Sequence, residues 1–266
     1  MKLPNLIRGI RFLWPFDNHW NLIVSRIFFR KNALLVYRKN DLEILIDHAG
    51  QDHNGTRLCI VTDIYSRFLA RMTLPETISV LDLGANGGGF PLMLHLHQKR
   101  FSRLVCVEMN PNTFQRLQFN MTRNIPGELT LINGAVCGEH RQFELFLGRG
   151  DISDSIYAEQ PAGVVEGKQR YVLQGYTFDE LFRAQFGAGA ADICKMDIEG
   201  AEYEVMATPG HQCLRACRYL LVELHTTTPE RLQQFASELE SAGFALLDAG
   251  DDKIPGERLY ENKSLQ

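Results

Sequence analysis

Short apolar runs with the character of β-strands alternate with helix-like stretches from about residue 42 to the end of this chain. The strand-like runs cover residues 42–47, 78–84, 103–109, 129–136, 191–198, 218–225, 244–250 and 257–263. The helix-like stretches lie near residues 57–71, 89–99, 111–124, 177–185, 200–207 and 229–242. Alternation of this kind is typical of an α/β fold, in which helices cover both faces of a mostly parallel sheet.

The last two strand-like runs differ from the others, since only residues 251–256 separate them. No helix fits into so short a connection, and Pro255 and Gly256 favour a turn, so we expect an antiparallel hairpin. We predict a mostly parallel seven-stranded sheet that ends in this hairpin, which is similar to the Rossmann-like sheet of class I methyltransferases. A nicotinamide-binding domain would usually continue with a helix instead.

Composition places the chain among globular proteins. It has 266 residues, of which 45% are hydrophobic, enough for one α/β domain with an appendage or at most two small domains. No apolar run approaches the roughly 20 residues that span a bilayer, and no signal-peptide pattern begins the chain, so we expect a cytoplasmic protein. The six cysteines are scattered without a CxxC pair, which favours neither a zinc site nor a disulfide framework.

Charge is distributed unevenly along the chain. Residues 1–39 hold eight basic residues and one acid, a net charge of +7, so the rest carries −11 of the total of −4. The acidic body argues against nucleic acid as a partner. We divide the chain into a basic, aromatic-rich helical extension or cap, residues 1–40, and an α/β domain, residues 41–266.

The basic segment 7–31 interleaves arginines with aromatic residues, among them Trp14 and Trp20. Pro15 interrupts any single long helix. A helical cap that packs on the α/β domain is the favoured interpretation. The alternatives are peripheral contact of residues 1–31 with an anionic membrane, a lid over the substrate site, and a contact in a homodimer.

A glycine-rich loop, GANGGG at residues 84–89, connects the second strand-like run to an apolar helix. Glycines allow a tight turn and the close approach of a ligand to the backbone. We therefore assign Gly84, Ala85, Asn86 and Gly87 to cofactor binding, although such a loop alone does not identify the cofactor.

Two acids make this prediction more specific. Asp82 precedes the loop, and S-adenosylmethionine, which carries a cationic ammonium and sulfonium but no phosphate, suits an acid there better than pyrophosphate does. The alternative is a structural acid that caps the turn through backbone N–H groups. Glu108 ends the next strand, 24 residues after Gly84, and an acid there accepts hydrogen bonds from the ribose hydroxyls of either cofactor.

Three further residues at strand ends are assigned to cofactor binding. Asn110 precedes Pro111 in the arrangement of a helix N-cap. Asn133 and Ala135 fall where such sheets contact adenine. Asn133 either binds the amino edge of the base or forms an Asn-Gly turn with Gly134.

The segment KMDIEGAEYEVM, residues 195–206, carries the candidate chemistry. Lys195, Asp197 and Glu199 point to one side of a strand, at the end where open α/β sheets bind ligands. The alternative is an exposed strand end with a local ion pair, which would contribute roughly 0–1 kcal/mol.

These motifs resemble those of the FkbM-type methyltransferase family. The resemblance rests on VLDLGANGGG (80–89), VEMNPNTFQRLQFNMTRN (107–124), DISDSIY (151–157), YTFDEL (176–181), KMDIEGAEYEVM (195–206) and LLVELH (220–225). It implies that residues 41–266 are an S-adenosylmethionine-dependent methyltransferase domain acting on hydroxyl groups of a small-molecule, sugar, glycan or natural-product acceptor. The chain departs from the family pattern at Phe178 and at residues 207–210, outside the predicted site.

Methylation of a hydroxyl group needs a base that takes its proton. The candidates are Asp197, Glu199 and His225, with Lys195 as a fourth catalytic residue, and Asp197 is also assigned to cofactor binding. His225 alternatively caps a turn at the end of its strand. Asp197, Glu223 and His225 are an alternative site for magnesium, which prefers such oxygen-rich groups.

Other interpretations stay open at this point. A polar loop with Asp151, Ser153, Asp154 and Ser155 either borders the acceptor pocket or is an ordinary turn. A nicotinamide-dependent oxidoreductase is disfavoured by Asp82, by the missing GxGxxG pattern and by the terminal hairpin. A protein that binds S-adenosylmethionine or a nucleotide without methyl transfer is the other alternative.

Overall fold

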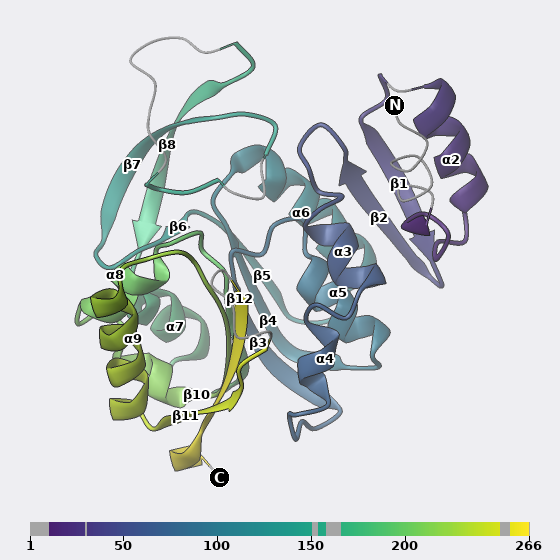
Figure 1. Ribbon diagram of the computed structural model, residues 1–266. Coiled ribbons are helices and arrows are strands. Elements are labelled where there is room, and N and C mark those ends of the chain that lie inside the picture. Colours follow the sequence, from purple (N-terminus) through teal and green to yellow (C-terminus); the bar gives the residue numbers. More distant parts are fainter. Residues whose placement is uncertain (1–10, 30, 151–153, 158–165, 251–255, 266) are drawn as a thin grey trace.

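The computed structural model describes residues 11–29, 31–150, 154–157, 166–250 and 256–265, which form an α/β fold (Figure 1). Its centre is a seven-stranded sheet with the strand order β11-β12-β10-β9-β3-β4-β5. The strands are β3 (Thr77–Leu83), β4 (Arg100–Glu108), β5 (Leu129–Asn133), β9 (Ala191–Met196), β10 (Cys217–Leu224), β11 (Phe244–Asp248) and β12 (Gly256–Asn262). Strands β3, β4, β5, β9 and β10 run parallel, whereas β12 is antiparallel to β10 and β11. The predicted Rossmann-like sheet and its C-terminal hairpin are confirmed.

The strand order changes direction at the centre of this sheet. From β3 the chain builds outward through β4 and β5, and it returns to the other side of β3 with β9 and β10. In open α/β sheets, ligands bind at such a switch point, outside the carboxyl ends of the strands. The fold therefore places a site at the ends of β3 and β9.

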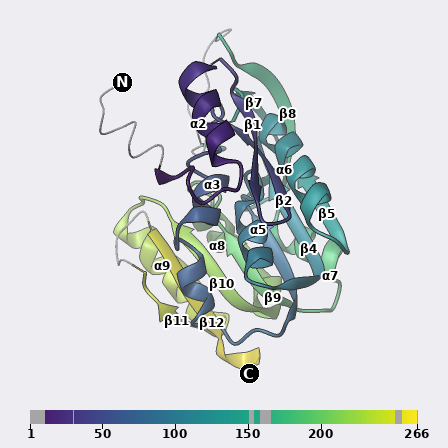
Figure 2. The same cartoon turned by 90° about the vertical axis from the view of Figure 1, so that its right-hand side faces the viewer.

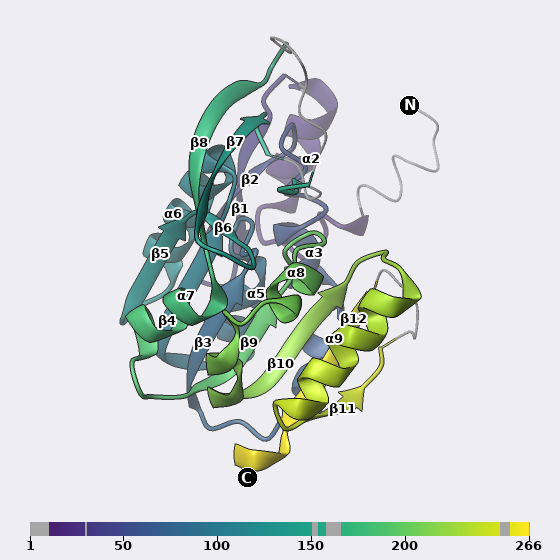
Figure 3. The ribbon, with the colours of Figure 1, turned by 90° about the vertical axis from the view of Figure 1, so that its left-hand side faces the viewer.

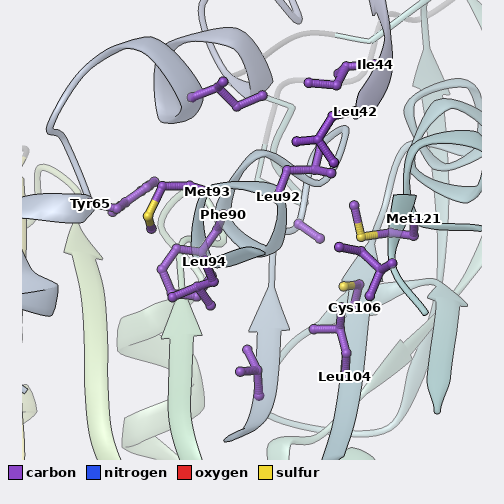
Figure 4. Packing of buried hydrophobic residues seen from close by; sticks show 14 of the residues in the cluster. Leu42, Ile44, Tyr65, Phe90, Leu92, Met93, Leu94, Leu104, Cys106 and Met121 are labelled. Atoms are coloured by element: carbon purple, nitrogen blue, oxygen red, sulfur yellow. The ribbon is translucent and has the colours of Figure 1, made fainter. Parts of the chain in front are cut away.

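Helices cover both faces of the sheet, and side chains alternate along β3 between two cores. One face carries α3 (Thr56–Val61), α4 (Ser66–Leu69), α5 (Gly89–Leu96) and α6 (Pro111–Asn124), and the other carries α7 (Phe178–Phe186), α8 (Glu202–Ala207) and α9 (Pro229–Ser241) (Figure 3). Val80 packs in the first core and Leu81 in the second. Phe90 and Leu92 of α5 fill the first core (Figure 4). No helix in the described ranges is long and apolar enough to cross a membrane.

The polar residues expected at helix starts occupy those positions. The Asn110 side chain accepts hydrogen bonds from the backbone N–H groups of Asn112 and Thr113, and Pro111 stands in the first turn of α6. Thr228 caps α9 with one such bond. Because these side chains satisfy N–H groups that a helix leaves without partners, both helices begin where the sequence predicts.

A separate layer precedes the seven-stranded sheet. It consists of α2 (His19–Phe28), β1 (Leu34–Lys39) and β2 (Leu42–Asp47), and the two strands pair as an antiparallel hairpin. Strand β2 is predicted, but its partner β1 lies in the extension expected to be helical. Asn40, with φ of 55°, turns the chain locally, so β2 pairs with β1 and stays outside the main sheet. The predicted boundary between residues 40 and 41 falls within this turn.

Two asparagines of α6 hold the hairpin against the domain. The side-chain amide of Asn120 accepts a hydrogen bond from Leu45 N at 2.7 Å and donates one to Leu45 O at 3.1 Å. Asn124, one turn later, makes the same pair of bonds with Glu43. Asn120 is fully buried and also donates to the carbonyl oxygen of Gly87 in the glycine-rich loop. Side chains, instead of another strand, thereby satisfy this edge of β2.

A second small sheet, with the order β6-β8-β7, is not predicted from the sequence. It consists of β6 (Ala135–Val136), β7 (Arg141–Leu147) and β8 (Gln169–Tyr176). The expected strand 129–136 is divided at Gly134 into β5 and β6, which belong to different sheets. The core of the small sheet is confined to a few buried leucines, such as Leu145 and Leu173, so its apolar pattern is weak.

Candidate active site

A cavity of about 270 Å³ opens at the carboxyl ends of β3, β4 and β9, where the strand order switches. Its wall includes predicted site residues from the segment 84–135 and from the segment 195–199. These residues are Gly84, Ala85, Asn86, Glu108, Ala135, Lys195, Asp197 and Glu199. Five predicted residues do not line it: Asp82, Gly87, Asn110, Asn133 and His225. We call the part beside the glycine-rich loop and Glu108 the glycine end, and the part beside Asp197, Glu199 and Glu223 the acidic end.

The glycine end has no room for a side chain at the first residue of the loop. Gly84 has φ of +76°, and a Cβ atom there would lie 1.7 Å from the carbonyl oxygen of Asp197. The backbone N–H groups of Gly84 and Ala85 both donate to the carbonyl oxygen of Val107. The ends of β3, β4 and β9 therefore approach one another as closely as glycine alone permits. Gly87 instead packs outside the cavity, where a Cβ would lie 2.4 Å from Thr56 Oγ1.

Backbone N–H groups fix the Glu108 carboxylate at the glycine end. Oε2 accepts a hydrogen bond from Asn86 N at 2.9 Å, and Oε1 accepts one from Asn110 N at 2.8 Å. Burial raises the pKa of Glu108 to about 7, although these two hydrogen bonds oppose the shift. Each carboxylate oxygen can accept more than one hydrogen bond, so Glu108 keeps the capacity to accept from two ligand hydroxyls.

Asp82 lies behind the cavity wall instead of within it. Its side chain is fully buried, and neither carboxylate oxygen accepts a hydrogen bond from a described residue. Lys195 Nζ lies 3.5 Å from Oδ1, and burial raises the pKa of Asp82 to about 6. Asp82 therefore does not cap the turn through backbone N–H groups, and the residue it faces, Lys195, lines the cavity in its place.

Lys195 joins the two ends of the cavity. Its Nζ donates to Gly84 O at 2.9 Å and lies 3.2 Å from Asp197 Oδ2. Burial lowers the pKa of Lys195, but the Asp197 and Asp82 carboxylates outweigh it and the net shift is upward. Lys195 is therefore a permanent cation that positions its neighbours, and it does not take up a proton.

Asp197 lines the acidic end of the cavity, and its Oδ1 atom is buried. Oδ2 accepts a hydrogen bond from the hydroxyl group of Tyr65 at 3.1 Å, whereas Oδ1 has no hydrogen-bond partner in the described part of the chain. Tyr65 lines the cavity but is missing from the predicted site. It lies 132 residues from Asp197 in the sequence, in the expected helix 57–71, and the chain breaks that helix into α3 and α4. No local pattern marks Tyr65.

His225 is held between two carboxylates. Its Nε2 lies 3.1 Å from Glu199 Oε2, and its Nδ1 lies 3.1 Å from Glu202 Oε1. Burial lowers the pKa of His225, but the hydrogen bonds to Glu199 and Glu202 raise it to about 11. His225 is therefore an imidazolium ion at neutral pH, which argues against the prediction that it is the base.

The contacts of His225 also show whether Asp197, Glu223 and His225 are suited to bind magnesium. Ligand atoms of Asp197, Glu223 and His225 all lie within 4.8 Å of one another. A histidine ligand must be neutral and must offer a free ring nitrogen, and both nitrogens of His225 are bonded to carboxylates. These residues therefore do not fit a magnesium ion.

The predicted asparagines shape the cavity from behind. Asn133 Nδ2 donates to the carbonyl oxygens of Glu108 and Met109, which holds the turn after β4. Asn110 caps α6 and donates to Asp154, which lines the cavity. Ser155 donates to the carbonyl oxygen of Glu199. Of the predicted polar loop, Asp151 and Ser153 lie outside the described residues.

Comparison with known protein families identifies the family of the chain that forms this cavity. Residues 82–246 match the family profile described as the methyltransferase FkbM domain. This chain belongs to the FkbM methyltransferase family. The family implies transfer of a methyl group from S-adenosylmethionine, so an oxidoreductase is set aside. Tyr65 lies before the matched residues, so the segment that precedes the family match also contributes a side chain to the cavity.

A solved structure of the same family has a similar fold. The FkbM methyltransferase chain is similar to methyltransferase FkbM from Methylobacillus flagellatus KT, with 16% identity and a TM-score of 0.51 over 75% of this chain and 47% of that chain. It therefore spans about half the length of that relative. It is also similar to a fibrillarin pre-rRNA processing protein from Methanococcus jannaschii, with 12% identity and a TM-score of 0.42 over 76% of each chain. None of the curated proteins compared with the chain matches it.

Proposed function

We propose that this FkbM methyltransferase methylates a hydroxyl group on a sugar, glycan or other small natural product. The observation that carries the proposal is Asp197, whose Oδ1 has no hydrogen-bond partner among the described residues while Lys195 and Tyr65 hold Oδ2. Because this carboxylate lines the cavity and keeps unused acceptor capacity, it can take the proton of an acceptor hydroxyl.

The glycine end fits S-adenosylmethionine. Gly84 lets the backbone approach the amino-acid part, and Glu108 is placed to accept hydrogen bonds from the ribose hydroxyls. Ala135, at the start of β6, adds an apolar wall for the base. Five acids line the wall with a single lysine among the described residues, Lys195: the acids are Glu108, Asp154, Asp197, Glu199 and Glu223. An excess of acids suits a cationic sulfonium.

Methyl transfer then needs two contributions from the chain. When bound, S-adenosylmethionine supplies an electrophilic methyl group on sulfur. The Asp197 carboxylate takes the proton of the acceptor hydroxyl as the oxygen–carbon bond forms and the sulfur–carbon bond breaks, and such a base contributes about 10²–10⁴-fold. Lys195 and Tyr65 keep the Asp197 carboxylate in the orientation that the in-line geometry requires.

The acidic end is suited to a polyhydroxylated acceptor. Glu199 and Glu223 line the cavity next to Asp197, and their carboxylates can accept hydrogen bonds from neighbouring hydroxyl groups of one sugar ring. His225 holds Glu199 from behind the wall, so it fixes an acceptor contact without touching the acceptor.

Asp197→Asn tests this proposal. The amide keeps the shape of the side chain but cannot take a proton, so kcat should fall by about 10²–10⁴-fold while the Kd of S-adenosylmethionine changes little. Asp192→Asn in β9, the strand that leads to Asp197, is the matched control, because Asp192 accepts its hydrogen bonds from Ser79.

The assay needs a panel of hydroxylated acceptors, with transfer of a labelled methyl group as the readout and calorimetry for cofactor affinity. Full activity of Asp197→Asn would show that another group takes the proton. Binding of S-adenosylmethionine without transfer to any hydroxyl acceptor, but with transfer to an amine, would replace the proposed acceptor class.

A further inference from the structure

Large apolar side chains are exposed together on one side of the N-terminal layer. We call this side the aromatic face, and it is formed by Trp14, Trp20, Val24, Ile27, Phe28 and Phe29. Phe28 is 74% exposed and Trp20 is 63% exposed. Single exposed apolar residues are normal on a protein surface, whereas a continuous group of this kind marks a site of contact.

The pattern along α2 shows that the exposure is built into the helix. The exposed residues Trp20, Val24, Ile27 and Phe28 follow the spacing i, i+4, i+7 and i+8, which places them on one side. The opposite side packs on the hairpin and buries Leu22. Packing on the domain requires one apolar side of a helix, and α2 has a second apolar side that this packing does not use.

Strand β1 holds the start of this helix in place. Asn18 ties the start of α2 to β1, because its Nδ2 donates to Val36 O at 2.8 Å and its Oδ1 accepts from Arg38 N at 3.0 Å. The rings of Trp14 and Trp20 lie 5.8 Å apart in an edge-on contact. The start of α2 is therefore fixed against β1, and Figure 2 shows the two elements side by side.

Basic residues border the aromatic face. Residues 11–42 contain six basic residues and two acids, in contrast to the acidic remainder of the chain. Arg11 and Lys31 are exposed in this segment, whereas the exposed Arg38 is paired with Glu43 at 3.2 Å. The local charge is therefore opposite to that of the body of the protein.

A buried cation adds to this positive potential from beneath. The Arg57 side chain is 6% exposed, and its Nε has no hydrogen-bond partner among the described residues. Burial, followed by the charges of Arg26, His53 and Arg57, lowers the pKa of His48 to about 3. A buried guanidinium group without a paired carboxylate is costly, and an anion held near it would reduce that cost.

We propose that the aromatic face docks on an anionic lipid bilayer, with its tryptophan and phenylalanine side chains among the headgroups and its basic border against the lipid phosphates. Aromatic side chains favour that boundary, and each lysine or arginine near an anionic surface contributes about 1 kcal/mol. This inference is independent of the acceptor that the cavity takes.

Charge favours a bilayer over a second copy of the chain. A twofold dimer through the aromatic face would place the same patch of both copies together and bring two basic borders into contact. An anionic bilayer instead supplies the opposite charge across the whole face. A dimer contact is therefore an outcome that the experiment must separate from membrane docking.

Intrinsic fluorescence of the full chain tests the proposal directly, because both tryptophans of the sequence, Trp14 and Trp20, lie in the aromatic face. Vesicles of phosphatidylcholine with phosphatidylglycerol should shift the emission to the blue and carry the protein upward in flotation. Vesicles of phosphatidylcholine alone should bind much less, and added salt should weaken the anionic interaction. Absence of binding to the anionic vesicles would overturn the proposal.

Two variants separate the apolar from the electrostatic contribution. The double variant Phe28→Ser with Phe29→Ser keeps both tryptophans and should lower the partition coefficient by about tenfold or more, because two phenyl groups no longer leave water. Lys31→Glu should weaken binding to the anionic vesicles alone. Phe119→Ser with Val172→Ser, exposed apolar residues on other elements, is the matched control and should bind as the parent does.

Methyl transfer to a soluble acceptor should stay unchanged in these variants, which also shows that they fold. Equal vesicle binding of the parent and the Phe28 and Phe29 variant would contradict the assignment. A second outcome would also contradict the assignment. In it, light scattering shows a concentration-dependent dimer of the parent that the Phe28 and Phe29 variant does not form, and the parent does not bind vesicles.

Discussion

The two ends of the cavity hold their charges in different ways. At the glycine end, both oxygens of Glu108 accept hydrogen bonds from backbone N–H groups. At the acidic end, Lys195 and His225 each lie between two carboxylates. A carboxylate that is stabilised by backbone N–H groups depends on the local fold. A cation that is stabilised by neighbouring carboxylates depends on the charge of each of those side chains. Substitutions at the glycine end should therefore change binding, and those at the acidic end should change turnover and pH dependence.

Gly84→Ala should have the largest effect, because Gly84 is the contact between the two ends. A Cβ atom would lie 1.7 Å from the carbonyl oxygen of Asp197, so the ends of β3 and β9 must separate. We expect the Kd of S-adenosylmethionine to rise by about 100-fold or more and the unfolding free energy to fall by about 2–4 kcal/mol.

Calorimetry and chemical denaturation measure the two quantities. Gly187→Ala is the matched control, since Gly187 also has a positive φ of 59° but no atom lies within 4 Å of the added Cβ. The control should cost about 1–2 kcal/mol of backbone strain and leave cofactor affinity unchanged. Equal effects of the two variants would mean that strain, not the contact with Asp197, is the cause.

His225→Gln tests the charge network of the acidic end. The pKa of His225 is raised to about 11 from its ordinary 6.5, so its charge stabilises the fold fully below pH 6.5, and this contribution is lost as pH rises towards 11. The difference in unfolding free energy between the parent and the variant should therefore shrink over that range. In the parent, NMR should show His225 protonated at neutral pH, and Glu199→Gln should lower its pKa. Titration of the parent ring near 6.5 would contradict the network.

Glu108→Gln should act on binding. We expect about tenfold weaker S-adenosylmethionine binding, because an amide oxygen is a weaker acceptor than a carboxylate. The pKa of Glu108 is raised from 4.5 to about 7, so the folded cofactor-free chain retains a proton that the unfolded chain releases, and stability falls as pH rises through this interval. Denaturation across that interval should show a smaller fall in the variant. Glu128→Gln, at an exposed ion pair, is the control and should preserve the fall.

Tyr65→Phe should have the smallest effect. It removes the hydrogen bond to Asp197 Oδ2 but leaves Lys195 in place, so kcat should fall by a factor of about 2–10 with the Kd of S-adenosylmethionine unchanged. Tyr219→Phe removes a hydroxyl group that bonds Thr73 and Glu261 away from the cavity, and it should leave kcat unchanged. A loss of cofactor affinity in Tyr65→Phe would place Tyr65 at the glycine end instead.

The same contrast explains what the sequence could predict. The glycine end is built from neighbouring residues, so the strand, the loop from Gly84 and the acid at Glu108 are visible as a local pattern. The Asn110–Pro111 helix start and the terminal hairpin are equally local. Each of these features depends on backbone geometry within one or two elements, and the structure has them where the sequence places them.

The acidic end depends on contacts that no local pattern contains. Asp82 faces Lys195 because β3 and β9 pair in that register, so the acid assigned to a ligand is neutralised from a neighbouring strand. His225 has the residue type of a base, but two carboxylates from another segment set its charge. Tyr65 reaches Asp197 only after the expected helix around it breaks in two.

The amide of Asn120 connects parts of the molecule that would otherwise respond separately. One carboxamide group bonds the outer edge of β2 and the carbonyl oxygen of Gly87. A cofactor that orders the glycine-rich loop and a partner surface that holds the N-terminal layer would then both act on the hydrogen bonds of this one carboxamide group. By thermodynamic linkage, the cofactor and the partner surface should change each other's affinity for the chain by the same factor.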